Sequence, residues 1–219
     1  MIQEPNYKQQ TGFAGEGVIQ FTLDQKHQSP FQCDGFAELN SWRSYLFRLG
    51  LVGQDSQRYG GYGYGNLSHR MNPDSSSFLI SGTQTGHLPL LCKEHYAVVE
   101  SASLDQNQIK AYGSIKPSSE ALTHAAIYMA RPDIQTVMHV HSPLLWQKAQ
   151  DMGLTCTDPS ITYGTPEMAN ATIQCVTARS ASTGIVAMLG HEDGIVVYSD
   201  SVDGAGSALL QAIARARQL

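Results

Sequence analysis

The chain has 219 residues, of which 42% are hydrophobic and 15% charged, and its formal net charge at pH 7 is −5. This length suits one globular domain, and an acidic balance without a basic stripe argues against a nucleic-acid partner. The N-terminal residues lack an apolar signal core, and no apolar run approaches the roughly 20 residues that span a bilayer. The four cysteines are scattered without a paired spacing, which favours reduced thiols. We therefore expect a cytoplasmic protein with no nucleic-acid or membrane partner.

Hydrophobic spacing predicts strands that alternate with helices along the chain. Residues 1–34 are expected to form an extended lead-in with one strand, and residues 35–219 a single domain. The clearest helix lies within 115–133, where Pro117 and two serines open it and Arg131 ends it. This alternation predicts an α/β fold in which helices cover one central sheet. In chain order, the expected elements are a strand at 18–23, a helix at 36–53, a turn that enters a strand within 58–70, strands at 78–82 and 95–104, the helix at 115–133, a strand at 134–142, a helix at 143–153, a loop that enters a helix within 161–180, two strands within 184–200 and a helix at 201–219.

Two histidines lie one residue apart in the apolar strand IQTVMHVHS. Side chains two positions apart on a strand face the same side, so His139 and His141 point together. Two imidazoles at this spacing can bind one divalent ion. The alternative is a pair of half-exposed histidines on a sheet face.

A third ligand is expected from the sequence LGHEDG, at the junction of two predicted strands. It supplies His191, with Asp193 two residues later. The alternative is a polar hairpin turn, because Glu, Asp and Gly all suit turns.

The sequence PSSE combines two hydroxyls with a carboxylate at the predicted start of a helix. Free N–H groups and the helix dipole favour an anion there, so Ser118 and Ser119 are candidate phosphate ligands. A plain serine cap is the alternative. The histidine strand follows this helix, which makes Glu120 a candidate general acid or base beside a metal. His124 shares the helix face of Glu120 and is placed to position it.

Two glycine-containing loops, GYGNLSHR and ISGTQTG, offer further candidate phosphate contacts. Gly65 and Asn66 lie in the first loop, and Ser81 and Gly82 lie in the second. Glycine permits close approach of a ligand to the backbone, but each loop also suits a tight turn. Neither matches a nucleotide-loop signature.

In their order along the chain, the segments GNLS, ISGTQTG, PSSE, MHVHS, YGTPEM and HEDG resemble the class II aldolase/adducin family over about residues 36–215. The family includes fuculose-phosphate and rhamnulose-phosphate aldolases, ribulose-phosphate epimerase, methylthioribulose-phosphate dehydratase and the non-catalytic adducin head. The resemblance implies a three-layer α/β/α sandwich, with helices on both faces of a largely antiparallel sheet. It also implies a homotetramer with sites at subunit boundaries.

The resemblance implies roles for individual residues. His139 and His141 match the zinc-binding histidines, and Glu120 matches the carboxylate that moves a proton beside the carbonyl. We therefore expect a metal-dependent lyase of the aldolase type, with zinc favoured, that acts on a small ketose or hydroxy-carbonyl compound through a metal-stabilised enediolate. The substrate is expected to be phosphorylated, and the matching phosphate-contacting residues are Gly65, Asn66, Ser81, Gly82, Ser118 and Ser119.

The sequence departs from the family pattern in two places. The third family histidine directly precedes a glycine, whereas here Asp193 holds that place and His191 lies two residues before it. We assign His191 as the third ligand, with Asp193 as the alternative or as a supporting group. The family aldolases also use tyrosines from a neighbouring subunit and the C-terminal tail, and no tyrosine follows Tyr198 here. The catalytic tyrosine is therefore not identified.

Three other functions compete with an aldolase. A sugar-phosphate dehydratase is the nearest, because it would use the same metal and Glu120. An epimerase fits less well, since similar epimerases carry aspartate at that position. A binding module like the adducin head would have lost the metal histidines, and this chain retains His139 and His141.

Overall fold

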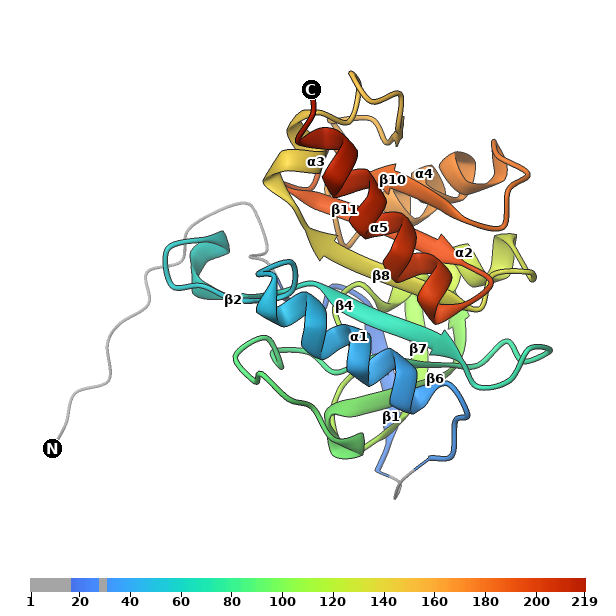
Figure 1. The fold of residues 1–219 in the computed structure, drawn as a ribbon. Coiled ribbons are helices and arrows are strands. Elements are labelled where there is room, and N and C mark those ends of the chain that lie inside the picture. Colours follow the sequence, from blue (N-terminus) through green and yellow to red (C-terminus); the bar gives the residue numbers. More distant parts are fainter. Residues whose placement is uncertain (1–16, 28–30) are drawn as a thin grey trace, which may run out of the picture.

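The computed structural model describes residues 17–27 and 31–219, which form a layered α/β sandwich (Figure 1). At its centre is a nine-stranded sheet with the strand order β1-β7-β6-β5-β4-β8-β11-β10-β9. Strands β1 and β7 pair in parallel, as do β9 and β10, whereas the other neighbours are antiparallel. The largely antiparallel sheet that the resemblance implied is therefore confirmed. Its strands are β1 (Thr22–Lys26), β4 (Asn66–Arg70), β5 (Phe78–Ser81), β6 (Tyr96–Ser103), β7 (Gln108–Gly113), β8 (Thr136–His141), β9 (Thr155–Cys156), β10 (Gly184–Ala187) and β11 (Gly194–Ser199).

Helices cover both faces of the sheet, as predicted (Figure 1). One face is packed by α1, α3 and α5, and the other by α2 and α4. Outside the main sheet, β2 and β3 form a two-stranded sheet that flanks the turn η1. The helices are α1 (Phe36–Arg48), α2 (Ala121–Ala130), α3 (Pro143–Gln147), α4 (Pro166–Thr177) and α5 (Val202–Ala216), and the small elements are β2 (Gly53–Gln54), η1 (Tyr59–Gly61), β3 (Gly63–Tyr64) and η2 (Lys93–His95).

Strand β8 is buried along its whole length, between β4 and β11. Successive side chains of β8 point to opposite faces of the sheet, and so they pack into two different hydrophobic cores. Met138 and Val140 pack under α1, α3 and α5, and Val137 packs under α2 and α4. His139 and His141 share the face of Val137. Two imidazoles therefore occupy interior positions at the end of a core strand.

The first strand begins later than predicted. The prediction placed it at 18–23, whereas β1 begins at Thr22, where parallel pairing with Gln108 of β7 begins. Strand β7 was not predicted from the sequence. Because β1 belongs to the segment 1–34, the sheet takes a strand from the predicted lead-in. The division of the chain at residue 34 stays a prediction, and residues 1–16 and 28–30 of that lead-in lie outside the described part.

The prediction that α2 opens at Pro117 is wrong, because the helix begins at Ala121. Pro117 forms an isolated antiparallel bridge with Gly82, and the amide of Thr83 donates to the carbonyl of Lys116 at 3.0 Å. These contacts keep the segment extended against the neighbouring loop. Both serines of the PSSE sequence therefore precede the helix.

The four cysteines carry free thiols. The Sγ atom of Cys175 donates to the carbonyl of Cys156 at 3.5 Å, and burial raises the pKa of both thiols. A raised pKa keeps these groups in the weakly nucleophilic thiol form at neutral pH. Within residues 17–27 and 31–219, no helix has the length and apolar character required to cross a bilayer.

Candidate metal centre

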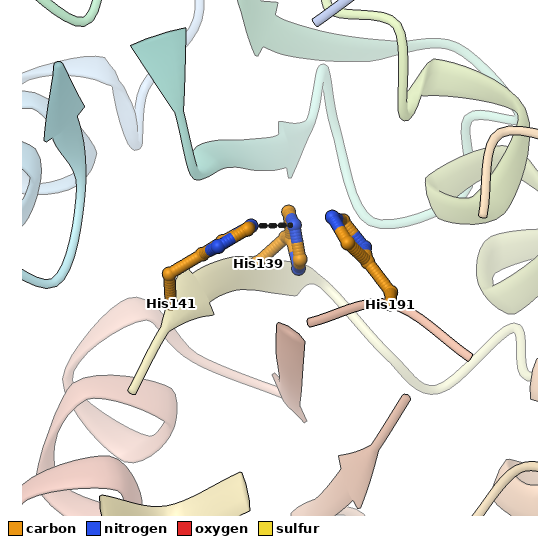
Figure 2. Close-up of side chains that lie close together, drawn as sticks. All are labelled: His139, His141 and His191. Atoms are coloured by element: carbon orange, nitrogen blue, oxygen red, sulfur yellow. Dashed lines mark hydrogen bonds between the residues drawn. The ribbon is translucent and has the colours of Figure 1, made fainter. Parts of the chain in front are cut away.

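Three histidines from two places in the sequence meet at the end of strand β8. His139 lies opposite Asn66 of β4, and His141 lies opposite Gly194 of β11. His191 lies in the turn that joins β10 to β11. Figure 2 shows the three rings converging on one point. The hairpin pairing of β10 and β11 and the pairing of β11 with β8 bring the third ring to the other two.

The ring nitrogens of the three histidines are close enough to share one ion. One nitrogen from each ring lies within 4.8 Å of the others. Nε2 of His141 is 3.2 Å from Nε2 of His139, and Nδ1 of His139 is 3.3 Å from the carbonyl oxygen of Ile195. A backbone carbonyl at Nδ1 favours a proton there, which leaves Nε2 of His139 available for a metal. The rings are almost fully buried, with exposed fractions of 1%, 0% and 1% for His139, His141 and His191.

The electrostatics and spacing of this cluster fit a divalent ion. Burial lowers the pKa of His141 well below its usual value and also lowers the pKa of His191, so both rings are neutral at pH 7. A neutral imidazole is the form that binds a metal. Two nitrogens bound at about 2.0–2.1 Å to a tetrahedral ion lie about 3.3 Å apart, close to the 3.2 Å between the two Nε2 atoms.

Glu120 lies beside this cluster as the N-cap residue of α2. Its side chain is 2% exposed, and Oε2 accepts a hydrogen bond of 2.9 Å from the hydroxyl of Thr123. Its negative charge acts on His191, where it raises the pKa against the larger lowering by burial. A buried carboxylate is thus held within electrostatic reach of the three imidazoles.

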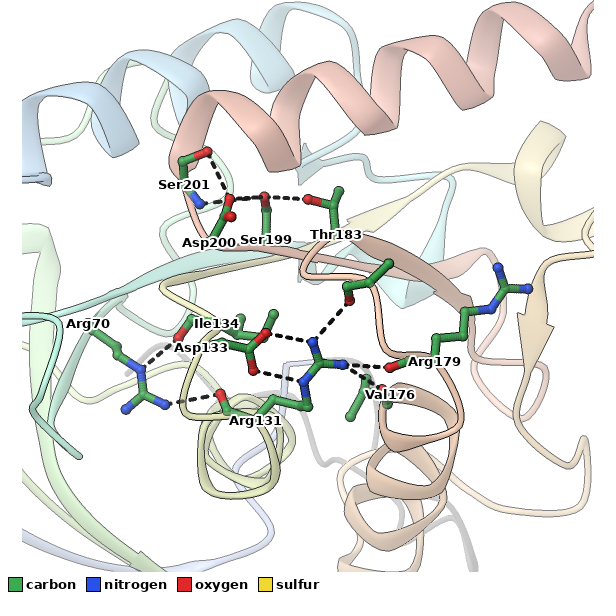
Figure 3. A network of polar contacts seen from close by, with 11 residues as sticks. Arg70, Arg131, Asp133, Ile134, Val176, Arg179, Thr183, Ser199, Asp200 and Ser201 are labelled. Carbon is green, nitrogen blue, oxygen red and sulfur yellow. Dashed lines mark hydrogen bonds and ion pairs between the residues drawn. The ribbon is translucent and has the colours of Figure 1, made fainter.

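The opposite end of α2 is anchored by arginine side chains (Figure 3). The guanidinium of Arg131 forms two bonds to the carboxylate of Asp133, at 2.8 and 2.6 Å. It also donates to the carbonyl of Val176, in α4, at 3.1 Å. Arg70 of β4 donates to the carbonyls of Ile134 and Arg131 at 2.7 and 3.3 Å. These bonds tie α2 to α4 and to the central sheet, and so restrict the helix that carries Glu120.

Asp193 lies next to the cluster but is bonded elsewhere. Its Oδ2 atom accepts a 2.6 Å hydrogen bond from the hydroxyl of Tyr59 and lies 3.5 Å from Nη2 of Arg58. The backbone of Asp193 has φ of 62°, a region that favours glycine. Asp193 directly precedes Gly194, the place where the family pattern has its third histidine. The geometry groups His191, rather than Asp193, with the strand histidines.

Two tyrosines pack directly on the histidine rings. The ring of Tyr59 meets His141 edge-on, with centroids 4.4 Å apart, and the ring of Tyr163 stacks on His191 at 4.3 Å. Burial, and then the hydrogen bond to Asp193, raises the pKa of Tyr59. The phenol of Tyr59 is therefore protonated at neutral pH. Neither tyrosine was singled out from the sequence.

A small polar cavity brings the predicted phosphate residues together. Gly65 and Asn66 of the first loop, Gly82 of the second, and Ser118 and Ser119 all line it. Within the described residues its lining is uncharged and also includes two threonines, Thr83 and Thr85.

Ser81 does not line this cavity. Its hydroxyl is buried and accepts a 3.2 Å hydrogen bond from the backbone amide of Leu67. Two residues that line the cavity are direct neighbours of residues in the candidate metal centre. Asn66 pairs with His139, and Ser119 immediately precedes Glu120.

Sequence relatives of this chain include dehydratases. The methylthioribulose-1-phosphate dehydratase of Leptospira interrogans is 36% identical over 81 residues, which cover 36% of this chain and 32% of that relative. The dehydratase of the same name from Xanthomonas euvesicatoria is 32% identical over 79 residues, which cover 36% of this chain and 33% of the relative. These alignments span about a third of each relative.

Structural relatives include aldolases and extend over most of the chain. An L-fuculose 1-phosphate aldolase superposes with a TM-score of 0.64 at 18% identity, covering 86% of this chain and 85% of the other. A sugar-phosphate aldolase from Thermotoga maritima gives a TM-score of 0.63 at 15% identity, covering 84% of this chain and 92% of the other. At such identities the likeness establishes a shared fold. The model of the class II aldolase and adducin N-terminal domain matches residues 55–218, and the chain therefore belongs to the class II aldolase and adducin family.

Proposed function

We propose that this chain is a divalent-metal-dependent lyase acting on a small phosphorylated ketose or hydroxy-carbonyl compound. The observation that carries the proposal is the buried cluster of His139, His141 and His191, with Glu120 beside it. A binding module without chemistry has no need of three buried imidazoles and a carboxylate in one desolvated place. Buried titratable groups gathered in this way are typical of catalytic sites.

In this proposal each group has one task. A divalent ion held by the three histidines, with zinc favoured, would supply a Lewis acid for the carbonyl and hydroxyl oxygens of the substrate. Glu120 would carry the proton that the carbon beside the carbonyl gains in aldol cleavage or loses in dehydration. Its bond from Thr123 at 2.9 Å orients one carboxylate oxygen.

The polar cavity would bind the phosphate end of the substrate. Its hydroxyl-bearing side chains, Ser118, Ser119 and Thr83, can donate hydrogen bonds to an anion, and its glycines allow the backbone to approach closely. Holding the phosphate there would fix the distance of the reacting carbons from Glu120, which is the advantage of orientation.

Cleavage of a carbon–carbon bond is the first candidate reaction, and it is supported by aldolases that share the fold over most of the chain. Elimination of water is the second candidate, and it is supported by dehydratases of higher sequence identity over about a third of their length. Both reactions need proton transfer at the same carbon, which gains the proton in cleavage and loses it in dehydration, and they also differ in the group that leaves.

Zinc binding and product analysis test the proposal. The purified protein is stripped with a chelator, titrated with Zn²⁺, and assayed on a panel of ketose phosphates for aldehyde release and for loss of water. We expect one bound zinc and one of these products, with activity of Glu120→Gln reduced about 100- to 10,000-fold while zinc binding persists. Glu167→Gln, at an exposed position on α4, is the matched control. A protein that takes up no divalent ion would refute the proposal.

The homotetramer and the cytoplasmic location also belong to this proposal. Light scattering on the eluted protein would measure the assembly directly, and a monomeric mass at micromolar concentration would contradict the tetramer.

A further inference from the structure

The histidine cluster is closed to solvent in this structure. His141 has an exposed fraction of 0%, and His139 and His191 have 1% each. A substrate must place several atoms beside these rings, so part of their cover has to move. The cover includes the rings of Tyr59 and Tyr163, which contact His141 and His191.

The carboxylate of Asp193 holds Tyr59 in place over the histidine cluster. Asp193 accepts the 2.6 Å bond from the Tyr59 hydroxyl, and the guanidinium of Arg58 lies 3.5 Å from the same oxygen. Arg58 also stacks over the rings of Tyr59 and Tyr64, at 4.7 and 5.2 Å from their centroids. Asp193 belongs to the turn that carries His191, so the fastening point and the third histidine are parts of one short segment.

The backbone under Tyr59 has the features of a hinge. Tyr59, Gly60 and Gly61 have φ of 51°, 67° and 80° in succession. A tyrosine in this left-handed region is strained, and the strain is held only while other contacts outweigh it. The nearest heavy atom to a Cβ placed on Gly61 is 3.8 Å away, so packing around this glycine is open. Two consecutive glycines can absorb a large change in φ and ψ.

A pocket lies next to Arg58 and offers space into which the Tyr59 segment could move. Arg58 and His141 both line it, together with apolar side chains from the end of α1 and from α5, among them Leu49, directly after α1, and Leu210 and Ile213. Because Arg58 belongs both to this pocket and to the contact with Asp193, rotation of the Tyr59 segment toward the pocket would uncover His141.

We propose that Arg58, Tyr59 and Asp193 form a latch over the histidine cluster, and that a substrate reaches the cluster when this latch opens toward the pocket between α1 and α5. Asp193 is then a positioning residue that holds Tyr59 closed. The proposal rests on the proposed function for its substrate, but the closing of the cluster is a property of the chain alone.

Acylation of histidine by diethyl pyrocarbonate, followed by peptide mass spectrometry, measures the opening on the metal-free protein. Tyr59→Phe keeps the ring and removes the bond to Asp193, and Asp193→Asn removes the charge. Each variant is expected to increase acylation of His139, His141 and His191 about 10- to 100-fold, the effect of losing one charge-assisted hydrogen bond. The matched controls, Tyr62→Phe and Glu192→Gln, change exposed side chains next to the latch and should react as the original chain does.

Two internal references separate opening from unfolding. His87 is exposed and should react equally in every variant, whereas His124 is fully buried in the core and reacts faster only if the chain unfolds. With Zn²⁺ bound, loss of the ion to a chelator should be faster by a similar factor in Tyr59→Phe. Unchanged acylation of the cluster in both latch variants would overturn the proposal. Failure of the protein to bind Zn²⁺ would instead refute the proposed function and leave the acylation result standing.

Discussion

Gly65 lies between the small sheet and β4, with φ of 75°, and a side chain there would meet Val52 and the backbone of His139. A Cβ atom at this position would lie 2.6 Å from Cγ1 of Val52 and 3.1 Å from the carbonyl oxygen of His139. Val52 is 2% exposed and branched at Cβ, so its side chain has little room to rotate away. We therefore predict that Gly65→Ala destabilises the protein in two ways, through its backbone conformation and through this contact.

The expected magnitude follows from those two contributions. An alanine in the left-handed region costs about 1–2 kcal/mol, and overpacking of a close-packed site costs about 1–3 kcal/mol. Gly153→Ala is the matched control, because Gly153 has φ of 65° and no heavy atom within 4 Å of its Cβ position. Urea unfolding of the metal-free protein should place Gly65→Ala about 1–3 kcal/mol below Gly153→Ala. Equal losses in the two variants would show that the contact with Val52 and His139 is not tight, and the reasoning would fail.

Three further predictions concern the interior around the site. Tyr128→Phe removes a buried hydroxyl that is 2.8 Å from the hydroxyl of Ser68, and urea unfolding should show a loss of about 1–2 kcal/mol; no loss would mean that the bond contributes nothing. Burial lowers the pKa of His124 and His141 below 6.5, so in the metal-free protein the unfolded chain binds protons that the folded chain does not, and stability should fall below about pH 6.5 by about 1.4 kcal/mol per pH unit for each histidine. Urea midpoints that stay constant from pH 7.5 to 5.5 would contradict this. Zn²⁺ at a thousand times its Kd should stabilise the protein by about 4 kcal/mol, and His139→Ala should abolish this gain.

Local sequence patterns were sufficient to predict the layers of the fold and the strand that carries two of the candidate metal ligands. The apolar run around His139 and His141 has the length and β-branched composition of a buried strand, and the apolar spacing from Phe36 is helical. Strand β7 was not predicted because its sequence, QIKAYG, is short and mixes polar with small residues. It is held as a strand by pairing with β6 and β1, which local pattern does not contain.

The contact between Tyr59 and Asp193, which covers the candidate site, could not be predicted from local sequence patterns. The hydroxyl of Tyr59 meets Asp193 across 134 residues of sequence, and only the folded sheet brings the two segments together. One signal did point there, since Asp193 stands directly before Gly194, where the family pattern has its third histidine. The backbone of Asp193 has φ of 62°, a conformation that is strained for a residue other than glycine. Contacts of Asp193 must therefore stabilise this conformation. The turn at Ser118 and Ser119 was misassigned for a related reason, because its conformation is set by a bridge to the distant Gly82.

Strand β8 lies in the interior of the nine-stranded sheet, whereas Tyr59 lies on a short 3₁₀ turn outside it. Amide protons in the middle of a sheet exchange with solvent mainly when the whole domain unfolds, and those of short turns exchange through small local openings. The amides of His139 and His141 should therefore be among the last in the chain to take up deuterium, and those of residues 59–61 among the first. Two time scales are thus expected: the candidate metal ligands should persist for the lifetime of the fold, while the segment above them should move many times within that lifetime.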